Sequence, residues 1–220
     1  MIRMSDAELF REVDEDYRRD RMIAFWRRYG TIVLAVMVMA MLASAGVNYY
    51  LAREQARKAA QTEAFEALLS GIKPGSETDS IMALSSFAAR ANPAQATLAL
   101  FTEAALRMRM GNPTAAAQDY HQIADGAQAS EELRDLAVVR LGYLNVDLPK
   151  PEPLIPRLEA IAAKNGPWRY SAREAIALLK AKAGDRDGAA KLLSDLAGDA
   201  GAPPDLAGRA RALADLYRGK

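Results

Sequence analysis

The stretch Gly111-Asn112-Pro113-Thr114-Ala115-Ala116-Ala117-Gln118-Asp119-Tyr120 decides the fold of this chain of 220 residues. Glycine tolerates the left-handed conformation that ends a helix, and asparagine followed by proline is typical of an N-cap and the first position of the next helix. Apolar residues lie on both sides of this signal at helical spacing. The stretch therefore predicts a hairpin of two helices, near 94–110 and 114–125.

The pattern of this hairpin returns twice further along the chain. Three sets of residues share a spacing of +4 and then +3, namely Ala116, Tyr120 and Ile123; Leu154, Leu158 and Ile161; and Ala189, Leu193 and Leu196. Twelve residues before each set lies a small residue, Ala104, Gly142 or Ala177, where two helices could approach closely. The successive offsets are 38 and 35 residues. The sequence therefore contains three related helical hairpins.

These units resemble tetratricopeptide (TPR) repeats, whose period is about 34 residues before loop insertions. The glycine turn and the alanine followed by an aromatic or aliphatic residue match, but the early tryptophan is absent. The middle turn is made irregular by four prolines, Pro149, Pro151, Pro153 and Pro156. We expect an all-α fold, a degenerate TPR-like α-hairpin solenoid over 76–220 with a capping helix at 204–218. A generic α-helical bundle is the alternative.

Helical stretches also occupy most of the remaining chain, and no segment alternates as a strand does. The 45 alanines favour helices as well. Besides the hairpin above, we expect helices near 54–70, 78–91, 131–146, 152–164, 168–183 and 186–198.

One segment before the repeats has the composition of a membrane span. From Tyr29 to Ala52 there are 24 consecutive uncharged residues, 19 of them hydrophobic. As a helix they reach roughly 36 Å, against roughly 30 Å of hydrocarbon in a bilayer. The residues flanking the span suit the headgroup region, and they are Trp26, Arg27, Arg28, Tyr29, Tyr49 and Tyr50. We therefore expect an N-terminal single transmembrane helix, a signal anchor over 29–52 in the lipid bilayer.

The charges beside the span predict its orientation. Residues 9–28 hold six arginines, whereas residues 53–72 hold three basic residues, which predicts a cytoplasmic N-terminus. Residues 1–28 then form a cytosolic charged amphipathic arm, with a helix starting near Ala7, and 53–75 form a stalk helix and linker.

Two alternatives remain for this segment. It could be the buried core helix of a soluble domain, or a signal peptide cleaved after Ala45, since Ala43-Ser44-Ala45 resembles a signal peptidase site. The preceding 28 residues carry seven acidic and seven basic side chains, which is too acidic for the start of a signal peptide. The uncleaved anchor is therefore the better interpretation.

Composition excludes several kinds of chemistry. The chain has no cysteine and one histidine, His121, so disulfides, thiol nucleophiles and multi-histidine zinc sites are impossible. No phosphate-binding loop or catalytic triad motif is present. Residues 53–220 carry 22 Lys/Arg against 21 Asp/Glu, so we expect no nucleic-acid surface. We expect no enzyme activity, catalytic residues, metal or cofactor, and a His121 that lies on the surface or lines a groove.

The repeats also predict a binding surface, because TPR domains often bind peptides along the first helices of their hairpins. The repeat phase projects six residues onto this groove, Phe101, Ala105, Met108, Val139, Tyr143 and Val146. They are apolar, which disfavours a carboxylate clamp and favours an exposed hydrophobic segment of a polypeptide. Alternatively, helix 78–91 fills the groove with its own apolar residues, Ile81, Leu84, Phe87 and Ala88.

The whole arrangement of arm, span, stalk and small degenerate TPR domain resembles the YfgM-like family of ancillary subunits of the SecYEG translocon. The arm, Arg11-Glu12-Val13-Asp14-Glu15-Asp16-Tyr17-Arg18-Arg19-Asp20-Arg21 followed by Trp26-Arg27-Arg28-Tyr29-Gly30, is similar to that of α-proteobacterial members. The resemblance implies a bacterial inner-membrane protein with a periplasmic repeat domain.

The same resemblance implies partners and a role. The partners would be SecYEG, periplasmic chaperones and translocating or unfolded polypeptides, with a chaperone-like role for translocated proteins. A scaffold for envelope assembly or cell division, without client binding, is the alternative function. A soluble periplasmic protein released after Ala45 is a third.

Overall fold

The structure of the protein is a computed structural model that describes residues 6–148 and 153–219, with side chains at Met22 and from Phe25 onward. Throughout these residues the regular secondary structure is helical, as the sequence predicts. The chain divides into two compact units, Met1–Ala60 and Gln61–Lys220.

Helix α1, Asp6–Gly71, supplies the first unit and continues into the second. Its stretch from Phe25 to Gly71 contains a segment long and apolar enough to cross a membrane, and none of that apolar segment is buried by other parts of the protein. A core helix of a soluble protein would be covered on at least one face. The exposure of this segment therefore favours a membrane span over the buried core helix of a soluble domain.

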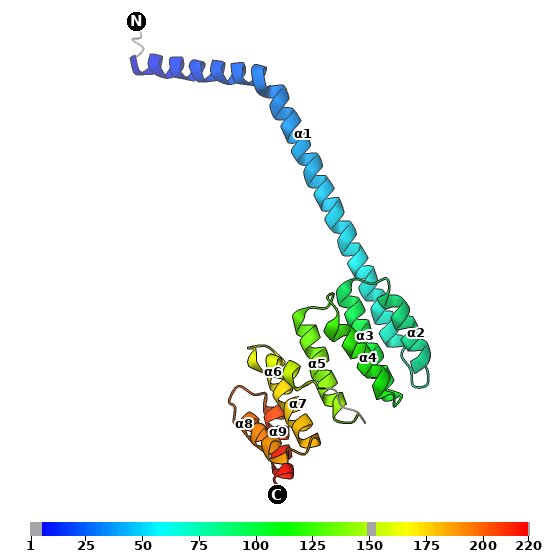
Figure 1. Cartoon of the computed structure of the whole chain (residues 1–220). Helices are drawn as coiled ribbons and strands as arrows, with labels where there is room; N and C mark the ends of the chain where they lie inside the picture. Colours follow the sequence, from blue (N-terminus) through cyan, green and yellow to red (C-terminus); the bar gives the residue numbers. More distant parts are fainter. Residues whose placement is uncertain (1–5, 149–152, 220) are drawn as a thin grey trace. The chain divides into compact units, whose positions relative to one another are not determined.

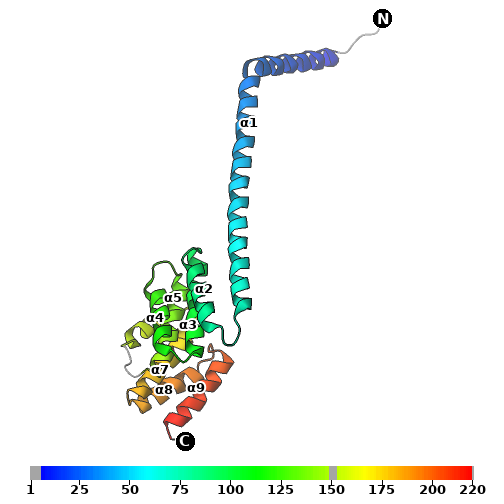
Figure 2. The same cartoon turned by 90° about the vertical axis from the view of Figure 1, so that its right-hand side faces the viewer.

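The second unit is built from helices that pack in chain order (Figure 1). They are α2 Glu77–Ala88, α3 Pro93–Arg109, α4 Pro113–Asp125, α5 Glu131–Asn145, α6 Ile155–Ala163, α7 Arg169–Lys182, α8 Arg186–Ala197 and α9 Pro204–Tyr217. The predicted hairpins are α3 with α4, α5 with α6, and α7 with α8. Helix α5 also packs against α7, and α7 against α9, so the stack continues to the chain end (Figure 2).

The turns of the first and third hairpins have the same construction. Gly111 and Gly184 adopt φ angles of 72° and 95°, which favour glycine. The amides of Asn112 and Asp185 then donate to the carbonyl five residues earlier, at 2.8 and 2.9 Å. The side chains of these two residues accept from the amide three residues later and so cap the next helix. In each turn a single residue, Asn112 or Asp185, thus closes one helix with its amide and caps the next with its side chain.

The repeat positions form the core of the hairpins. All nine residues of the three matching sets are at most 8% exposed, and the small residues that precede them are buried. A Cβ atom added to Gly142 would lie 3.0 Å from Leu158 Cδ1 and 3.1 Å from the Cβ of Ala175. The glycine therefore allows α5 to approach both its hairpin partner α6 and the next helix α7.

Some boundaries differ from the sequence prediction, such as the end of α2 at Ala88 rather than near 91. Helix α6 begins at Ile155 rather than near 152, with Pro156 in its first turn, where the missing N–H is not needed. Pro149 and Pro151 of the predicted irregular turn lie outside the described residues, as do residues 1–5 of the arm. Within residues 53–75, the predicted stalk and linker, the side chains of Phe65, Leu68 and Ile72 pack against the core of the second unit.

We expect the substitution Gly142→Val to lower the free energy of unfolding by about 1–3 kcal/mol, because the new side chain overpacks the α5–α6–α7 contact. Thermal unfolding of the full chain in detergent measures this change. The control is Gly208→Val at an exposed position of α9, where an added Cβ meets no atom within 4 Å. Equal melting temperatures for the two variants would contradict the close-approach role of Gly142.

Candidate functional site

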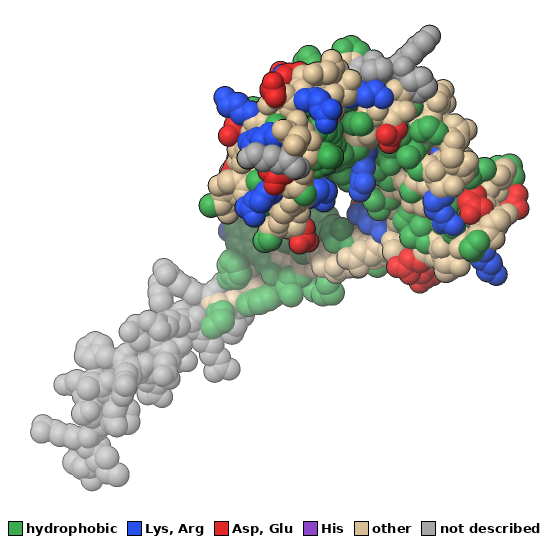
Figure 3. Space-filling model, turned by 90° about the horizontal axis from the view of Figure 1, so that it is seen from below, with side chains coloured by type: hydrophobic (Ala, Val, Ile, Leu, Met, Phe, Trp, Pro, Cys, Tyr) green, Lys and Arg blue, Asp and Glu red, His purple; other side chains and the backbone are tan. Residues whose placement is uncertain are grey.

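The predicted groove residues differ in exposure. Ala105 and Met108 are exposed on α3, whereas Phe101, Tyr143 and Val146 are half-buried and pack against one core cluster. Val139, the remaining member, is only 2% exposed, so it supports this face from inside. Figure 3 views the molecule from below and shows hydrophobic side chains gathered toward the middle, with charged ones of both signs around them. The groove stays a prediction.

The alternative in which helix 78–91 covers this groove is wrong. The apolar side of α2 packs elsewhere, because Leu84 forms a cluster with Ala99 and Leu106 of α3. The ring of Phe87 stacks on that of Phe65, with centroids 5.6 Å apart. Helix α2 therefore covers a different face of α3.

A cavity of about 640 Å³ lies between α2, α3, α4 and the loop after α4. Its α3 wall includes Ala96, Leu100, Glu103 and Arg107, whose spacing of four, three and four residues marks one helical face. Phe101, Ala105 and Met108 of the predicted groove follow the same spacing on another face of α3. The cavity is therefore a site separate from the predicted groove.

Two buried carboxylates line this cavity. Glu103 is 2% exposed and Asp119 is 5% exposed. Arg107 lies between them, with its Nε 2.8 Å from Asp119 Oδ2 and its Nη2 3.5 Å from Glu103 Oε2. The hydroxyl of Ser85 donates to Glu103 Oε2 at 2.9 Å, whereas Glu103 Oε1 has no hydrogen-bond partner among the described residues.

Burial determines the proton affinity of Asp119. It raises the pKa of this carboxyl to about 6, an effect that Arg107 opposes and the charge of Glu103 strengthens. A carboxylate prefers water to a site with one shared cation. The ionised form of Asp119 is therefore less stable in the folded protein than in the unfolded chain.

Sequence reasoning missed this pair, although α3 carries a signal for it. Glu103 lies four residues after Ala99 and three before Leu106, and both of these apolar residues are buried. A charged residue at a core position of an amphipathic helix needs a partner. The i, i+4 partner Arg107 was also visible in the sequence, but its second partner Asp119 comes from the neighbouring helix.

A third buried carboxylate, Glu174, joins three helices. Arg209 of α9 holds it with two hydrogen bonds, at 2.6 and 2.8 Å, and the hydroxyl of Tyr143 on α5 donates to it at 2.5 Å. Burial and the adjacent carboxylate raise the pKa of Tyr143, and the hydrogen bonds to Glu174 raise the pKa of Arg209. Tyr143 of the predicted groove therefore acts here as a structural donor.

The repeat phase would have led to Glu174. Counting back 35 and then 38 residues from it gives Val139 and Phe101, two residues of the predicted groove. Extending the projection to the third hairpin thus reaches a charged residue where the first two hairpins have apolar ones. The sequence does not show that Arg209 meets it, because α9 lies outside the three repeats.

Comparison with known proteins agrees with this architecture. The sequence profile of the tetratricopeptide repeat-like domain family matches residues 24–189, which is most of the chain. The chain belongs to this family. Its TPR-like domain is of a kind that typically mediates protein interaction and is non-catalytic. Neither a curated protein nor a solved structure matches the chain.

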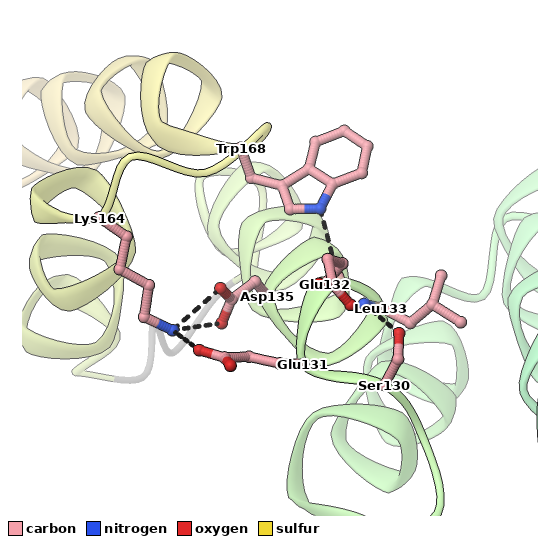
Figure 4. A network of polar contacts seen from close by, with 7 residues as sticks. All are labelled: Ser130, Glu131, Glu132, Leu133, Asp135, Lys164 and Trp168. Carbon is pink, nitrogen blue, oxygen red and sulfur yellow. Dashed lines mark hydrogen bonds and ion pairs between the residues drawn. The ribbon is translucent and has the colours of Figure 1, made fainter.

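The ends of the second TPR-like hairpin are held by polar contacts (Figure 4). Lys164 at the end of α6 donates to Glu131 at 2.6 Å and to Asp135 at 3.1 Å, both on the first turns of α5. The indole N–H of Trp168, just before α7, donates to the carbonyl of Glu132 at 2.8 Å. These contacts lie in solvent and fix the hairpin rather than form a binding site.

The predicted membrane-interface residues are all exposed on α1. The aromatic side chains are exposed, and these are Trp26, Tyr29, Tyr49 and Tyr50. The two arginines are exposed as well, and the guanidinium of Arg28 lies over the ring of Tyr29, 5.7 Å from its centroid.

The lone histidine, His121, is half-buried, and its Nδ1 lies 3.6 Å from Asp125 Oδ2. No group of three His, Cys, Asp or Glu residues suited to a metal ion occurs in the part of the chain that the structure describes.

The raised pKa of Asp119 gives a pH dependence with a definite sign. The folded protein keeps the proton up to about pH 6, so this group's stabilising contribution is greatest at low pH and is lost as the pH rises from 3.8 to about 6. We expect Asp119→Asn to unfold at a higher temperature than the wild type at pH 7.5, by up to about 3 kcal/mol in free energy. The difference should shrink toward pH 4.

Thermal unfolding of the full chain in detergent at several pH values tests this expectation. Asp195→Asn on the exposed face of α8 is the matched control and should show no pH-dependent gain. A stability difference for Asp119→Asn that grows toward low pH would contradict the assignment.

Removal of Arg209 should leave the Glu174 charge buried without its cation. We expect Arg209→Leu to destabilise the protein by roughly 2–4 kcal/mol, and the double variant with Glu174→Leu to recover part of this loss. Denaturant unfolding of the single and double variants measures both effects. Arg211→Leu, an exposed position on the same helix, is the control. A double variant less stable than Arg209→Leu alone would show that Glu174 is not the charge being compensated.

Proposed function

We propose that the protein is an inner-membrane-anchored periplasmic TPR-like interaction module, an ancillary subunit of the SecYEG translocon with a chaperone-like role for translocated proteins. The observation that carries the proposal is the combination in one chain of an uncovered apolar helix and a TPR-like repeat unit. The apolar helix suits a bilayer, and a TPR-like repeat unit typically binds a protein partner.

The composition of the helix supports anchoring. Its apolar residues are exposed, and an apolar surface of this length is stable only in hydrocarbon or against another apolar surface. Aromatic side chains mark both ends of the uncharged segment 29–52. The arginine excess before this segment supports a cytoplasmic N-terminus and a periplasmic repeat unit.

Tethering supports a role for weak binding. A domain held at the membrane meets emerging chains at a high effective concentration, so modest affinity is sufficient. The exposed Met108 and half-buried Phe101 offer adaptable apolar surface on the first helix of a TPR-like hairpin. SecYEG, periplasmic chaperones and translocating chains are the partners that we propose for the repeat unit.

Photocrosslinking in living bacterial cells tests this function. We expect a photoreactive amino acid at Met108 to crosslink to SecYEG subunits, periplasmic chaperones and newly translocated proteins. The same amino acid at Glu159, exposed on α6, is the control and should crosslink to few of them. The chain itself should stay in the membrane fraction after an alkaline wash and keep its full mass.

Other outcomes contradict the proposal in different ways. Crosslinks to division or envelope-assembly proteins without any unfolded client would favour the scaffold function. Release from the membrane with loss of residues 1–45 would show cleavage after Ala45. Absence of all translocon and chaperone crosslinks from Met108 would contradict the translocon role.

A further inference from the structure

The cavity between α2, α3 and α4 has the size of a binding site. Its volume of about 640 Å³ lies within the range of about 300–1,000 Å³ typical of pockets that hold small ligands. Small residues line much of its wall, which leaves space between the helices, and these include Ala88, Ala89, Ala96, Gly126, Ala127 and Ala129. Leu100 and Ile123 add apolar surface. An extended side chain and the adjoining main chain would fit there.

The charges of this cavity do not balance. Among the described residues that line it, only Glu103, Asp119 and Arg107 carry charge, so two carboxylates face one guanidinium. Arg107 is shared between them, since its Nε lies 2.8 Å from Asp119 Oδ2 without the geometry of a hydrogen bond, and its Nη2 donates to Glu103 Oε2 at 3.5 Å. The two carboxylates therefore share one cation, and each keeps one oxygen, Glu103 Oε1 and Asp119 Oδ2, without a hydrogen-bond partner among the described residues.

One oxygen of Glu103 lacks a hydrogen bond. Oε2 accepts from Ser85 at 2.9 Å, but Oε1 has no partner among the residues that the structure describes, although the side chain is 2% exposed. A buried acceptor without a donor is costly, and the cost is greatest for a charged one. A donor that entered the cavity with a positive charge would remove both deficits.

We propose that this cavity is a subsite for a lysine or arginine side chain of a bound polypeptide. The apolar stem of the basic side chain lies along Ala96 and Leu100, and its ammonium or guanidinium group donates to Oε1 of Glu103. This inference rests on the proposed function, because it takes a polypeptide as the partner of the repeat unit. It adds a charge preference to that function.

The subsite differs from the predicted apolar groove in place and in chemistry. It lies on the face of α3 that α2 and α4 border, whereas Phe101, Ala105 and Met108 follow another face. A polypeptide segment that is apolar and basic could therefore use both surfaces, whereas an acidic side chain would be repelled by the excess carboxylate. The protein should accordingly select basic over acidic segments.

Binding of short fluorescent peptides to the full chain in detergent micelles tests the subsite. The peptides share one apolar sequence and differ at a single central residue, which is lysine, arginine, norleucine or glutamate. Norleucine keeps the length of the lysine stem without the charge. We expect the lysine and arginine peptides to bind about tenfold more tightly than the norleucine peptide, and the glutamate peptide to bind most weakly.

Three variants assign this preference to the cavity. Glu103→Gln keeps the side-chain shape without the charge, and it should reduce the affinity for the lysine peptide to that for norleucine. Ala96→Leu fills the cavity without changing a charge and should have the same effect, so the test stands even if Glu103→Gln unfolds. Glu159→Gln, exposed on α6, is the matched control and should keep the preference. Melting temperatures establish that each variant is folded.

The possible failures are distinguishable. If the lysine and norleucine peptides bind equally, water alone fills the cavity, and the subsite is wrong while the proposed function stands. If folded Glu103→Gln and Ala96→Leu variants both keep the preference, the basic side chain binds elsewhere and the subsite is again wrong. If no peptide binds at all, polypeptide binding by the repeat unit is contradicted and the subsite with it.

Discussion

The repeat unit depends on the close approach of helices at its small buried positions, Ala104, Gly142 and Ala177. At Gly142 the absence of a side chain gives room to Leu158 of α6 and to Ala175 of α7. Dispersion and apolar burial fall off over a fraction of an ångström, so this approach determines how well the surrounding leucines and isoleucines pack. At Gly142 even a methyl group would crowd two neighbouring helices.

The buried carboxylates depend on the same packing. Glu103 and Glu174 occupy core positions of α3 and α7, where apolar residues would be simpler and often no less stable. Each makes contacts beyond its own hairpin, Glu103 with Ser85 of α2 and Glu174 with α5 and α9. The two differ in completeness, because both oxygens of Glu174 accept a hydrogen bond from Arg209, whereas Oε1 of Glu103 accepts none from a described residue. The complete network connects α5, α7 and α9, and the incomplete one lies beside the cavity for which we propose binding.

The apolar segment of α1 and the repeat unit have compositions that suit different surroundings, hydrocarbon for the segment and water for the repeat unit. The charge-free segment 29–52 has no protein cover and the properties of a membrane span, whereas residues 53–220 are nearly neutral with charges of both signs. The final turns of α1 belong to the repeat unit through Phe65, Leu68 and Ile72. The connection to the apolar segment is therefore a continuation of one helix, without a linker rich in glycine or proline.

The sequence by itself determined the helices, the hairpin phase and the apolar segment, because these follow from local rules. Gly111 and Gly184 end helices, Asn112 and Asp185 begin them, and spacings of three and four residues mark the buried faces. Only the tertiary structure decided which faces meet. It placed α2 on Ala99 and Leu106 rather than on the predicted groove, and it brought Asp119 to Arg107 and Arg209 to Glu174 across separate helices. Such contacts depend on the relative rotation and position of neighbouring helices, which no spacing within a single helix specifies.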